Sequence, residues 1–334
     1  MYKDSISHIA KEIEFSNLSI LVTGATGLIG TCIIDTLIVA NKKYGKKIKI
    51  YALGRSKEKI EQKFGNNNVV PVIQDIAKPL DTSNQYDYII HGASNADPKS
   101  YAIFPVETIL TNILGNKNVM DYCLKYINTK VILTSTFEVY GEIEGIHSYS
   151  EDMSGVIDQT ILRNGYPESK RSSELLLRSY VDEYHVNALI ARLPSVYGPT
   201  MIKDDSKAHA QFIRNAVRCK DIVLKSKGLQ KRSYCYVVDV VSAIFKLLKY
   251  GENGHIYNVS NENSIASIFQ VAKTCADIVG TKVVYDLPDA TEQKGFSKSQ
   301  DCILDNHKLR SLGWKGNFSL KEGIMETIEE LRTK

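Results

Sequence analysis

A glycine-rich turn between an apolar run and a helical pattern is the feature that most constrains the fold of this chain. Residues 18–23 are Leu-Ser-Ile-Leu-Val-Thr, and Gly24, Gly27 and Gly30 follow before an apolar helix over 31–40. In a dinucleotide-binding turn, the first glycine allows the tight turn, the second lets the backbone approach a pyrophosphate, and the third allows close packing of helix on strand. The helix N-terminus attracts the anion. The strand–turn–helix context therefore predicts a dinucleotide site, although the spacing departs from Gly-x-Gly-x-x-Gly and a turn with a packing role alone is the alternative.

Further apolar runs alternate with helical patterns. Strands are predicted at 47–53, 69–73, 88–91, 131–134 and 188–193, and the clearest helices at 106–126 and 167–184. Nearly all-apolar strands that alternate with helices indicate a parallel sheet covered on both faces. The predicted fold class is α/β: a doubly wound parallel sheet of the Rossmann type, followed by a smaller α/β substrate-binding part at the C-terminus.

Three regions are expected along the 334 residues. Residues 1–17 are predicted to form an N-terminal helical extension, and 18–195 the dinucleotide-binding domain. Residues 196–334 are expected to form mainly the substrate-binding domain, because the regular rhythm of strands and helices ends there. Some segments of 235–260 are expected to return to the first domain.

Composition argues against several classes of function. Lys+Arg 42 against Asp+Glu 38 gives a net charge of +4, which is too mild for a nucleic-acid partner. No stretch reaches the roughly 18 apolar residues of a membrane span, and the first residues do not resemble a signal peptide. The six cysteines and seven histidines show no metal-ligand spacing. We therefore expect no metal and no membrane, and a cytoplasmic protein with reduced thiols.

Tyr166 and Lys170 are the candidate proton-transfer pair. They lie one helical turn apart and share one helix face. A unit charge about 4 Å from a phenol contributes roughly 4 kcal/mol at an effective dielectric constant of about 20. This would lower the pKa of Tyr166 by about 3 units, to the range in which a general acid/base is most effective. Ser135 and Thr136 close an apolar run upstream, and a chance Tyr-x-x-x-Lys helix is the alternative.

The turn after the second strand bears on the choice of cofactor. An acidic residue at this place usually accepts hydrogen bonds from the adenosine ribose. Here Gly54 is followed by Arg55, Ser56 and Lys57, with no carboxylate. Arg55 and Ser56 could contact a 2′-phosphate, which favours NADP and leaves NAD open. A solvated basic loop is the alternative.

Several motifs occur together and in a fixed order. They are Gly24-x-x-Gly27-x-x-Gly30, Asp75-Ile76, His91-Gly-Ala-Ser94, Thr136 and Tyr166-x-x-x-Lys170. In this order they resemble the extended short-chain dehydrogenase/reductase superfamily. Three later motifs resemble its nucleotide-sugar epimerase/dehydratase branch: Thr136 to Gly141, Arg192 to Pro199 and Lys231 to Asp239. UDP-glucuronate decarboxylases and nucleotide-sugar 4,6-dehydratases are most similar, and UDP-glucose 4-epimerases are close.

The resemblance implies a nucleotide-diphosphate sugar as substrate and NAD or NADP as cofactor. Tyr166 would take the proton of the sugar C4 hydroxyl, with Thr136 bonded to the same oxygen. Lys170 would hold the nicotinamide ribose and lower the pKa of the tyrosine. Glu138 would act at C5 once C4 is a ketone, although it could instead bond backbone at the strand end.

The resemblance also implies the binding residues. For the cofactor they are Gly24, Thr26, Gly27, Leu28, Ile29, Gly30, Arg55, Ser56, Asp75, Ile76, Ala93, Tyr166, Lys170 and Pro194. For the substrate they are Ser94, Thr136, Ser195 and Arg232. Arg232 is the best candidate for the diphosphate, and Asn112 would support the catalytic geometry without touching substrate. A homodimer through the helices at 106–126 and 167–184, and a setting in glycan precursor synthesis, are implied as well.

The chain departs from this branch at three positions. Ser195 stands where the branch usually has asparagine, Pro194 where it has phenylalanine, and Phe137 where dehydratases have aspartate. Decarboxylation, epimerisation and dehydration therefore stay open, as do the base and the sugar. A net NADPH-dependent reductase of a 4-keto nucleotide sugar and a non-enzymatic cofactor-binding module also stay open.

Overall fold

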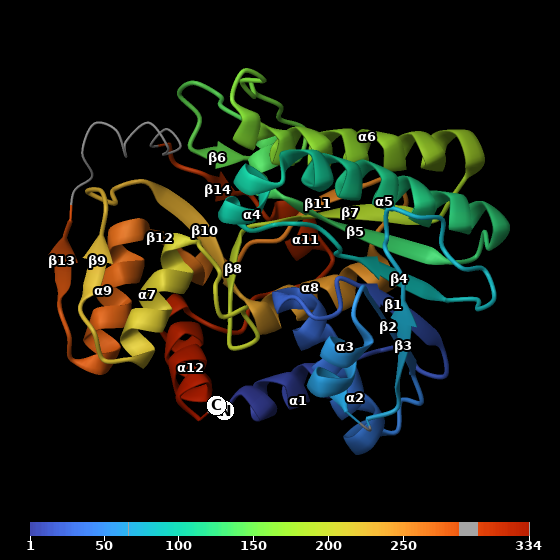
Figure 1. Ribbon diagram of the computed structural model, residues 1–334, viewed down its shortest axis with the longest axis horizontal. Coiled ribbons are helices and arrows are strands. Elements are labelled where there is room, and N and C mark those ends of the chain that lie inside the picture. Colours follow the sequence, from blue (N-terminus) through green and yellow to red (C-terminus); the bar gives the residue numbers. More distant parts are fainter. Residues whose placement is uncertain (66, 287–299, 334) are drawn as a thin grey trace.

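A seven-stranded parallel sheet forms the centre of the computed structural model, which describes residues 1–65, 67–286 and 300–333 (Figure 1). In spatial order its strands are β3 (Val69–Ile73), β2 (Lys49–Gly54), β1 (Ser19–Thr23), β4 (Tyr88–His91), β5 (Lys130–Thr136), β7 (Ala188–Leu193) and β11 (Ile256–Asn258). This order begins 3-2-1-4-5, as in dinucleotide-binding sheets. The predicted doubly wound α/β fold is confirmed.

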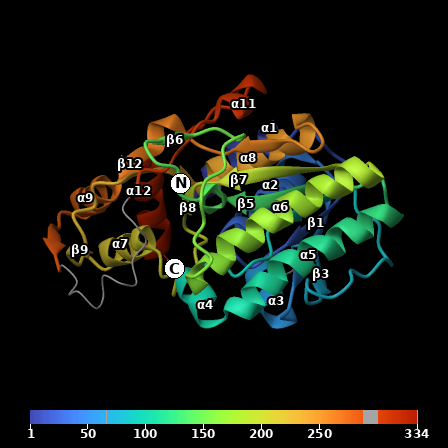
Figure 2. The same ribbon diagram turned by 90° about the horizontal axis from the view of Figure 1, so that it is seen from above.

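Helices cover both faces of the sheet. On one face lie α5 (Pro105–Lys125) and α6 (Gly165–Tyr184), side by side in Figure 2. On the other lie α1 (Tyr2–Glu12), α2 (Leu28–Tyr44), α3 (Lys57–Phe64) and α8 (Val237–Tyr250). Successive strand residues point to opposite faces. In β1, Ile20 and Val22 therefore join the core with α2 and α8, while Leu21 joins the core with α5.

A smaller α/β part follows β7 and lies beside the carboxyl edge of the sheet (Figure 1). Its strands are β8 (Ser195–Tyr197), β10 (Lys231–Tyr236) and β12 (Ile265–Ser267) in one sheet, β9 (Ile222–Leu224) with β13 (Val283–Tyr285), and β14 (Ile303–Leu304) with β6 (Ser148–Tyr149). Its helices are α7 (Ala208–Val217), α9 (Ile268–Val279) and α12 (Leu320–Arg332), whereas α11 (His307–Ser311) lies against β11 of the large sheet. The remaining elements are α4 (Pro98–Ile103), η1 (Phe137–Tyr140), η2 (Leu162–Asn164) and η3 (Glu262–Ser264).

The chain returns to the large sheet after entering the smaller part. β10 leads directly into α8, which packs on α2, and β11 then pairs with β7. This path passes through 235–260, the segment expected to return; the domain division itself stays a prediction. In the described part of the chain, no helix is long and apolar enough to cross a membrane.

Candidate active site

The glycine turn lies at the carboxyl end of β1 and is shaped for close approach. Gly24 has a φ of 69°, and a Cβ there would lie 2.8 Å from the Gly92 carbonyl oxygen. A Cβ at Gly30 would lie 2.3 Å from the Gly24 carbonyl oxygen, so only glycine lets α2 come this close to the turn. At Gly27 the nearest atom is 3.3 Å away, and no side chain caps the helix. The N-terminus of α2 therefore presents bare backbone, which fits a pyrophosphate.

The rest of the turn is held by its neighbours. The carbonyl of Thr26 accepts a hydrogen bond from Lys63 of α3 at 2.8 Å, and the carbonyl of Leu28 accepts one from Thr200 at 2.7 Å. Ile29 packs against the core on the α2 face. Lys63 belongs to none of the sequence motifs, so its contact with the turn could be seen only in the structure.

A second loop, after β4, is fastened to the end of β1. Thr23 Oγ1 accepts hydrogen bonds from the backbone N–H groups of Gly92 and Ala93, each at 3.1 Å. His91 Nδ1 lies 2.8 Å from the same hydroxyl. Burial, and then the charge of Lys170, lower the pKa of His91 to about 3. The neutral imidazole can thus accept a hydrogen bond from the Thr23 hydroxyl. These bonds hold the loop after β4 beside Gly24.

The predicted Thr136, Tyr166 and Lys170 come together at the ends of β5 and α6. Tyr166 is buried, and burial raises the pKa of its phenol well above the ordinary value, with Glu138 and Tyr101 adding to the shift. A hydrogen bond with the Thr136 side chain acts in the opposite direction. The phenol of Tyr166 and the hydroxyl of Thr136 therefore face one another.

Lys170 does not have the predicted effect on the tyrosine. Its Nζ donates to the carbonyl oxygen of Thr134 at 3.0 Å, and its charge does not contribute to the pKa shift of Tyr166. Burial lowers the pKa of Lys170 to about 8, and Glu174 opposes this. The predicted lowering of the Tyr166 pKa is thus wrong for the protein's own groups, because burial, Glu138 and Tyr101 raise that pKa.

Hydrogen bonds between α5 and α6 set the start of α6. Asn112 Nδ2 donates to Ser169 Oγ at 2.9 Å, and Ser169 Oγ donates to the carbonyl of Tyr166 at 2.8 Å. Ser173 Oγ donates to the carbonyl of Asn112 at 3.0 Å. Asn112 is thus linked through Ser169 to the backbone of Tyr166, and its supporting role stays a prediction.

A buried ion pair behind Lys170 is a site feature that the sequence reasoning missed. Arg192 Nη2 lies 2.7 Å from Glu174 Oε2, and both side chains are less than a tenth exposed. Ser135 Oγ also donates to Glu174. Each residue belongs to a helix or strand pattern that gives no sign of the pairing, so only the fold reveals it.

Glu138 has a cationic partner that the sequence reasoning also missed. It lies in η1, two residues after Thr136, and its carboxylate is 3.3 Å from Arg163 Nη2 of η2. The same nitrogen donates to Tyr101 Oη at 3.1 Å. The ring of Tyr101 stacks on Tyr166, with centroids 5.0 Å apart and an interplanar angle of 10°. Arg163, Glu138 and Tyr101 thus form a cluster against the phenol.

Of the predicted substrate residues, Ser195 and Arg232 lie in β8 and β10 of the smaller part. β8 pairs with β10 so that Ser195 lies opposite Tyr234, and Pro194 is buried just before it. The guanidinium of Arg232 lies 5.8 Å from the ring of Phe137, which begins η1. Within the described residues, Arg232 Nε and Ser94 Oγ are buried without a hydrogen-bond partner. A polar ligand there would satisfy these atoms.

At the adenosine end the predicted residues are bonded within the protein. Arg55 pairs with Glu107 at 2.9 Å, and Ser56 caps α3 by accepting from the Lys59 N–H. Asp75 Oδ1 accepts from the backbone N–H of Ala77 at 2.9 Å. Ile76 is buried between the sheet and α5. Thus the structure does not present Arg55 and Ser56 as uncommitted phosphate ligands.

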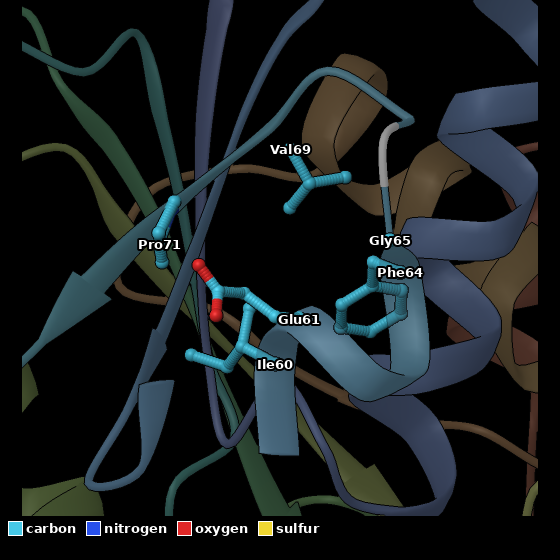
Figure 3. A pocket seen from close by; sticks show the side chains of 6 residues that line it. All are labelled: Ile60, Glu61, Phe64, Gly65, Val69 and Pro71. Atoms are coloured by element: carbon cyan, nitrogen blue, oxygen red, sulfur yellow. The ribbon is translucent and has the colours of Figure 1, made fainter. Parts of the chain in front are cut away.

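A hollow seen in Figure 3 lies away from these residues, between α3 and β3. It is lined by Ile60, Glu61, Phe64, Gly65, Val69 and Pro71. None of the predicted site residues lines it, and Glu61 has the one charged side chain among its lining residues. In the described part of the chain there is also no group of three or more His, Cys, Asp or Glu side chains that could hold a metal ion.

The sheet order, the bare glycine turn and the Thr–Tyr–Lys set define a dinucleotide-binding protein of the short-chain dehydrogenase/reductase type. Residues 20–260 match the NAD dependent epimerase/dehydratase family, and the chain belongs to that family. It is therefore an enzyme of the nucleotide-sugar epimerase, dehydratase and decarboxylase group, as the resemblance implied, and not a non-enzymatic binding module.

Known proteins are similar over nearly the whole chain. UDP-glucuronic acid decarboxylase 6 of Arabidopsis thaliana is 31% identical over 325 residues, covering 96% of this chain and 90% of that protein. The crystal structure of UDP-glucose 4-epimerase with UDP-glucose from Thermotoga maritima is 26% identical, with a TM-score of 0.79, and covers 95% of this chain and 99% of that one. dTDP-glucose 4,6-dehydratase of Bacillus anthracis in complex with NAD is 19% identical, with a TM-score of 0.77 and 94% and 96% coverage, and supports the fold alone.

Proposed function

We propose that the protein is a UDP-glucuronate decarboxylase that oxidises the sugar at C4, releases carbon dioxide from C5 and restores the C4 hydroxyl. The observation that carries this proposal is the 31% identity to a UDP-glucuronic acid decarboxylase over 96% of the chain. The placement of Glu138 and its arginine partner beside Tyr166 supports it.

Tyr166 and Thr136 act at the C4 oxygen. Thr136 hydrogen-bonds the hydroxyl, and Tyr166 accepts its proton and later returns it. NAD, when bound at the glycine turn, supplies a hydride acceptor and a positive charge that favours the phenolate. Lys170, held by the Thr134 carbonyl at 3.0 Å, positions the nicotinamide ribose.

Decarboxylation follows from the ketone at C4. The carboxylate on C5 is then β to a carbonyl, so the C5–C6 bond can break with its electron pair delocalised onto the C4 oxygen. Carbon dioxide leaves, and C5 takes up a proton. Thr136 and Tyr166 stabilise the developing charge on O4. Glu138 would deliver the proton that C5 takes up.

The diphosphate of the substrate would be held from the smaller part. Arg232 can bind phosphate oxygens bidentately. Arg232 Nε and Ser94 Oγ have no hydrogen-bond partner among the described residues, which supports a polar ligand for these atoms. Ser195 is shorter than the usual asparagine and would contact the substrate through its hydroxyl. This division of labour assigns the cofactor to residues 18–195 and the substrate mainly to 196–334.

NAD is the cofactor favoured over NADP. Arg55, the candidate ligand of a 2′-phosphate, already pairs with Glu107. Solved structures with the same fold carry NAD. A net reductase would need an exchangeable reduced cofactor, whereas a decarboxylase of this kind retains it. Denaturing the purified protein and identifying the released dinucleotide by mass tests retention and cofactor choice together.

4-Epimerisation of a UDP-hexose is the second candidate. The similarity to a UDP-glucose 4-epimerase at 26% identity favours it. It would use the same oxidation at C4 but no reaction at C5. Dehydration is disfavoured, because Phe137 stands where a dehydratase has its acid and packs near Arg232.

A panel of UDP-sugars distinguishes these reactions. Purified protein incubated with UDP-glucuronate should release carbon dioxide and form a UDP-pentose, detected by mass spectrometry. UDP-glucose, UDP-galactose and dTDP-glucose should be returned unchanged. Conversion of UDP-glucose to UDP-galactose without carbon dioxide from UDP-glucuronate would replace the proposal by the epimerase assignment.

A further inference from the structure

The cluster of Arg163, Glu138 and Tyr101 joins three elements that are distant in the sequence. Arg163 comes from η2, Glu138 from η1 and Tyr101 from α4. Arg163 Nη2 lies 3.3 Å from Glu138 Oε2 and 3.1 Å from Tyr101 Oη, and its guanidinium carbon is 5.6 Å from the Tyr101 ring centre. A charged group placed by three separate elements is fixed by the fold and not by local sequence.

The cluster borders the reacting atoms. Tyr101 stacks on Tyr166 with centroids 5.0 Å apart. Glu138 is close enough to Tyr166 that its charge contributes to the raised pKa of the phenol. The guanidinium of Arg163 is therefore one side chain away from the oxygen that would take the C4 proton.

Arg163 has binding capacity left over. A guanidinium carries five N–H donors, and the hydrogen bonds it makes to described residues use Nη2 alone. The side chain of Arg163 is 32% exposed and that of Glu138 is 23% exposed, so a ligand can reach the pair. Lys170 donates to the Thr134 carbonyl, and the guanidinium of Arg232 lies over the ring of Phe137.

We propose that Arg163 receives the C5 carboxylate of the sugar and thereby selects a hexuronate over a neutral hexose. This assignment rests on the proposed function, since Tyr166 and Thr136 at O4 place the next ring carbon, C5, toward Glu138. A carboxylate on that carbon meets the guanidinium that Glu138 pairs with. Two N–H donors can hold it bidentately, and the Glu138 carboxylate competes for the same cation.

The test is ligand binding by calorimetry in the Tyr166→Phe holoenzyme, whose turnover is expected to be about 10³-fold slower. UDP-glucuronate should bind at least about 10-fold more tightly than UDP-glucose. Arg163→Gln should weaken UDP-glucuronate binding by about 10- to 100-fold and leave UDP-glucose and UDP within about 3-fold, as expected for loss of a charged hydrogen-bonding partner. Arg163→Lys should retain part of the discrimination, and Arg178→Gln, an exposed arginine further along α6, should retain all of it.

A second variant tests the competition independently of Arg163. Glu138→Gln removes the internal carboxylate from the guanidinium, so it should tighten UDP-glucuronate binding and leave UDP-glucose unchanged. Equal weakening of all three ligands by Arg163→Gln, or no preference for UDP-glucuronate in the parent, would overturn the assignment. If Arg163→Gln does not fold, an unchanged preference in Glu138→Gln overturns it.

The failure of this inference differs from the failure of the proposed function. Preferential binding of UDP-glucuronate through Arg163 without release of carbon dioxide would keep the subsite and discard the reaction. Release of carbon dioxide with discrimination unaffected by Arg163→Gln would keep the reaction and discard the subsite.

Discussion

The phenol of Tyr166 lies in a setting dominated by burial. Desolvation, Glu138 and Tyr101 all raise its pKa, and the hydrogen bond with Thr136 lowers it. The stacked ring of Tyr101 shields the phenol from water on one side. To accept the C4 hydroxyl proton, Tyr166 must be a phenolate, a form that the positive charge of bound oxidised nicotinamide would favour.

Replacing the phenol tests this role. Tyr166→Phe should lower turnover by about 10³-fold, within the range for loss of a general acid/base, while the stack on Tyr101 and cofactor retention persist. Turnover is followed by product formation and retention by the dinucleotide released on denaturation. Tyr101→Phe, which keeps the ring stack, should cost less activity. Normal turnover of Tyr166→Phe would refute the proton-transfer role.

The lowered pKa of Lys170 makes the free energy of unfolding depend on pH in a known direction. Burial lowers its pKa from 10.5 to about 8, so between these values the unfolded chain binds more protons than the folded one. The contribution of Lys170 to the free energy of unfolding therefore increases as the pH rises from 8 to 10.5. Below that window its buried charge is a cost.

Lys170→Met should remove this dependence. Denaturant unfolding of the wild type and the variant at several pH values should show their difference moving in favour of the wild type as the pH rises. Lys117→Met provides the control, because Lys117 is half exposed and pairs with Asp121 at the surface. A wild-type minus Lys170→Met difference that stays constant across the window would contradict the assignment.

Within the glycine turn between β1 and α2, Gly30 serves the packing of the helix and Gly27 the approach of a ligand. A Cβ at Gly30 would lie 2.3 Å from a backbone oxygen of Gly24, so α2 would have to move away from the turn. A Cβ at Gly27 would meet that oxygen at 3.3 Å and would project where the bare helix N-terminus is open. The two positions therefore have different tasks in one short segment.

Two alanine variants distinguish these tasks. Gly30→Ala should lower the melting temperature of the protein markedly and abolish cofactor binding as a consequence. Gly27→Ala should leave the melting temperature nearly unchanged and weaken cofactor binding by roughly 10-fold or more, the effect of losing a close backbone contact. Similar melting temperatures for the two variants, measured by calorimetry, would show that the packing argument is wrong.

Elements with clear periodicity were predictable from the sequence. β3, β4 and β7 have the predicted bounds, because apolar runs bordered by polar residues define buried strands. α2 begins at Leu28, before the predicted residue 31, because Gly27 caps it without a side chain. The motif residues Thr136 and Tyr166 lie together in the structure, and their catalytic roles and that of Lys170 stay predictions.

The missed features depend on contacts between distant residues. Arg163 is a lone arginine in an irregular stretch, and only the meeting of η2, η1 and α4 gives it Glu138 and Tyr101 as partners. The pairing of Glu174 with Arg192 joins α6 to β7 in the same way. The pKa of Tyr166 could not be predicted from one neighbour, because burial is a property of the complete fold.

At the scale of the whole molecule, the exposed apolar side chains of α5 and α6 support the proposed homodimer. Val106 is 69% exposed, Leu110 46% and Leu114 36% on α5, and Leu175 is 65% exposed on α6. These helices pack on each other at the outer side of the sheet (Figure 2). A second copy of the same pair would bury these side chains in a four-helix interface.

A charged pair of substitutions tests the dimer. Leu110→Asp with Leu175→Glu should convert the protein to a monomer in sedimentation velocity, because two carboxylates would be buried in an apolar interface. Val156→Asp is the control, since Val156 is 72% exposed on a different segment. A wild type that sediments as a monomer, or a double variant that stays dimeric, would contradict the proposal.

The central claim, transient oxidation at C4 by the Tyr166 site, is tested most directly with UDP-glucuronate deuterated at C4. Transient oxidation at C4 should give a UDP-pentose that retains the deuterium at C4, carbon dioxide in equal amount and no net accumulation of reduced cofactor. Tyr166→Phe should form these products about 10³-fold more slowly. Loss of the deuterium from C4 in the product, or stoichiometric accumulation of reduced cofactor, would contradict the account.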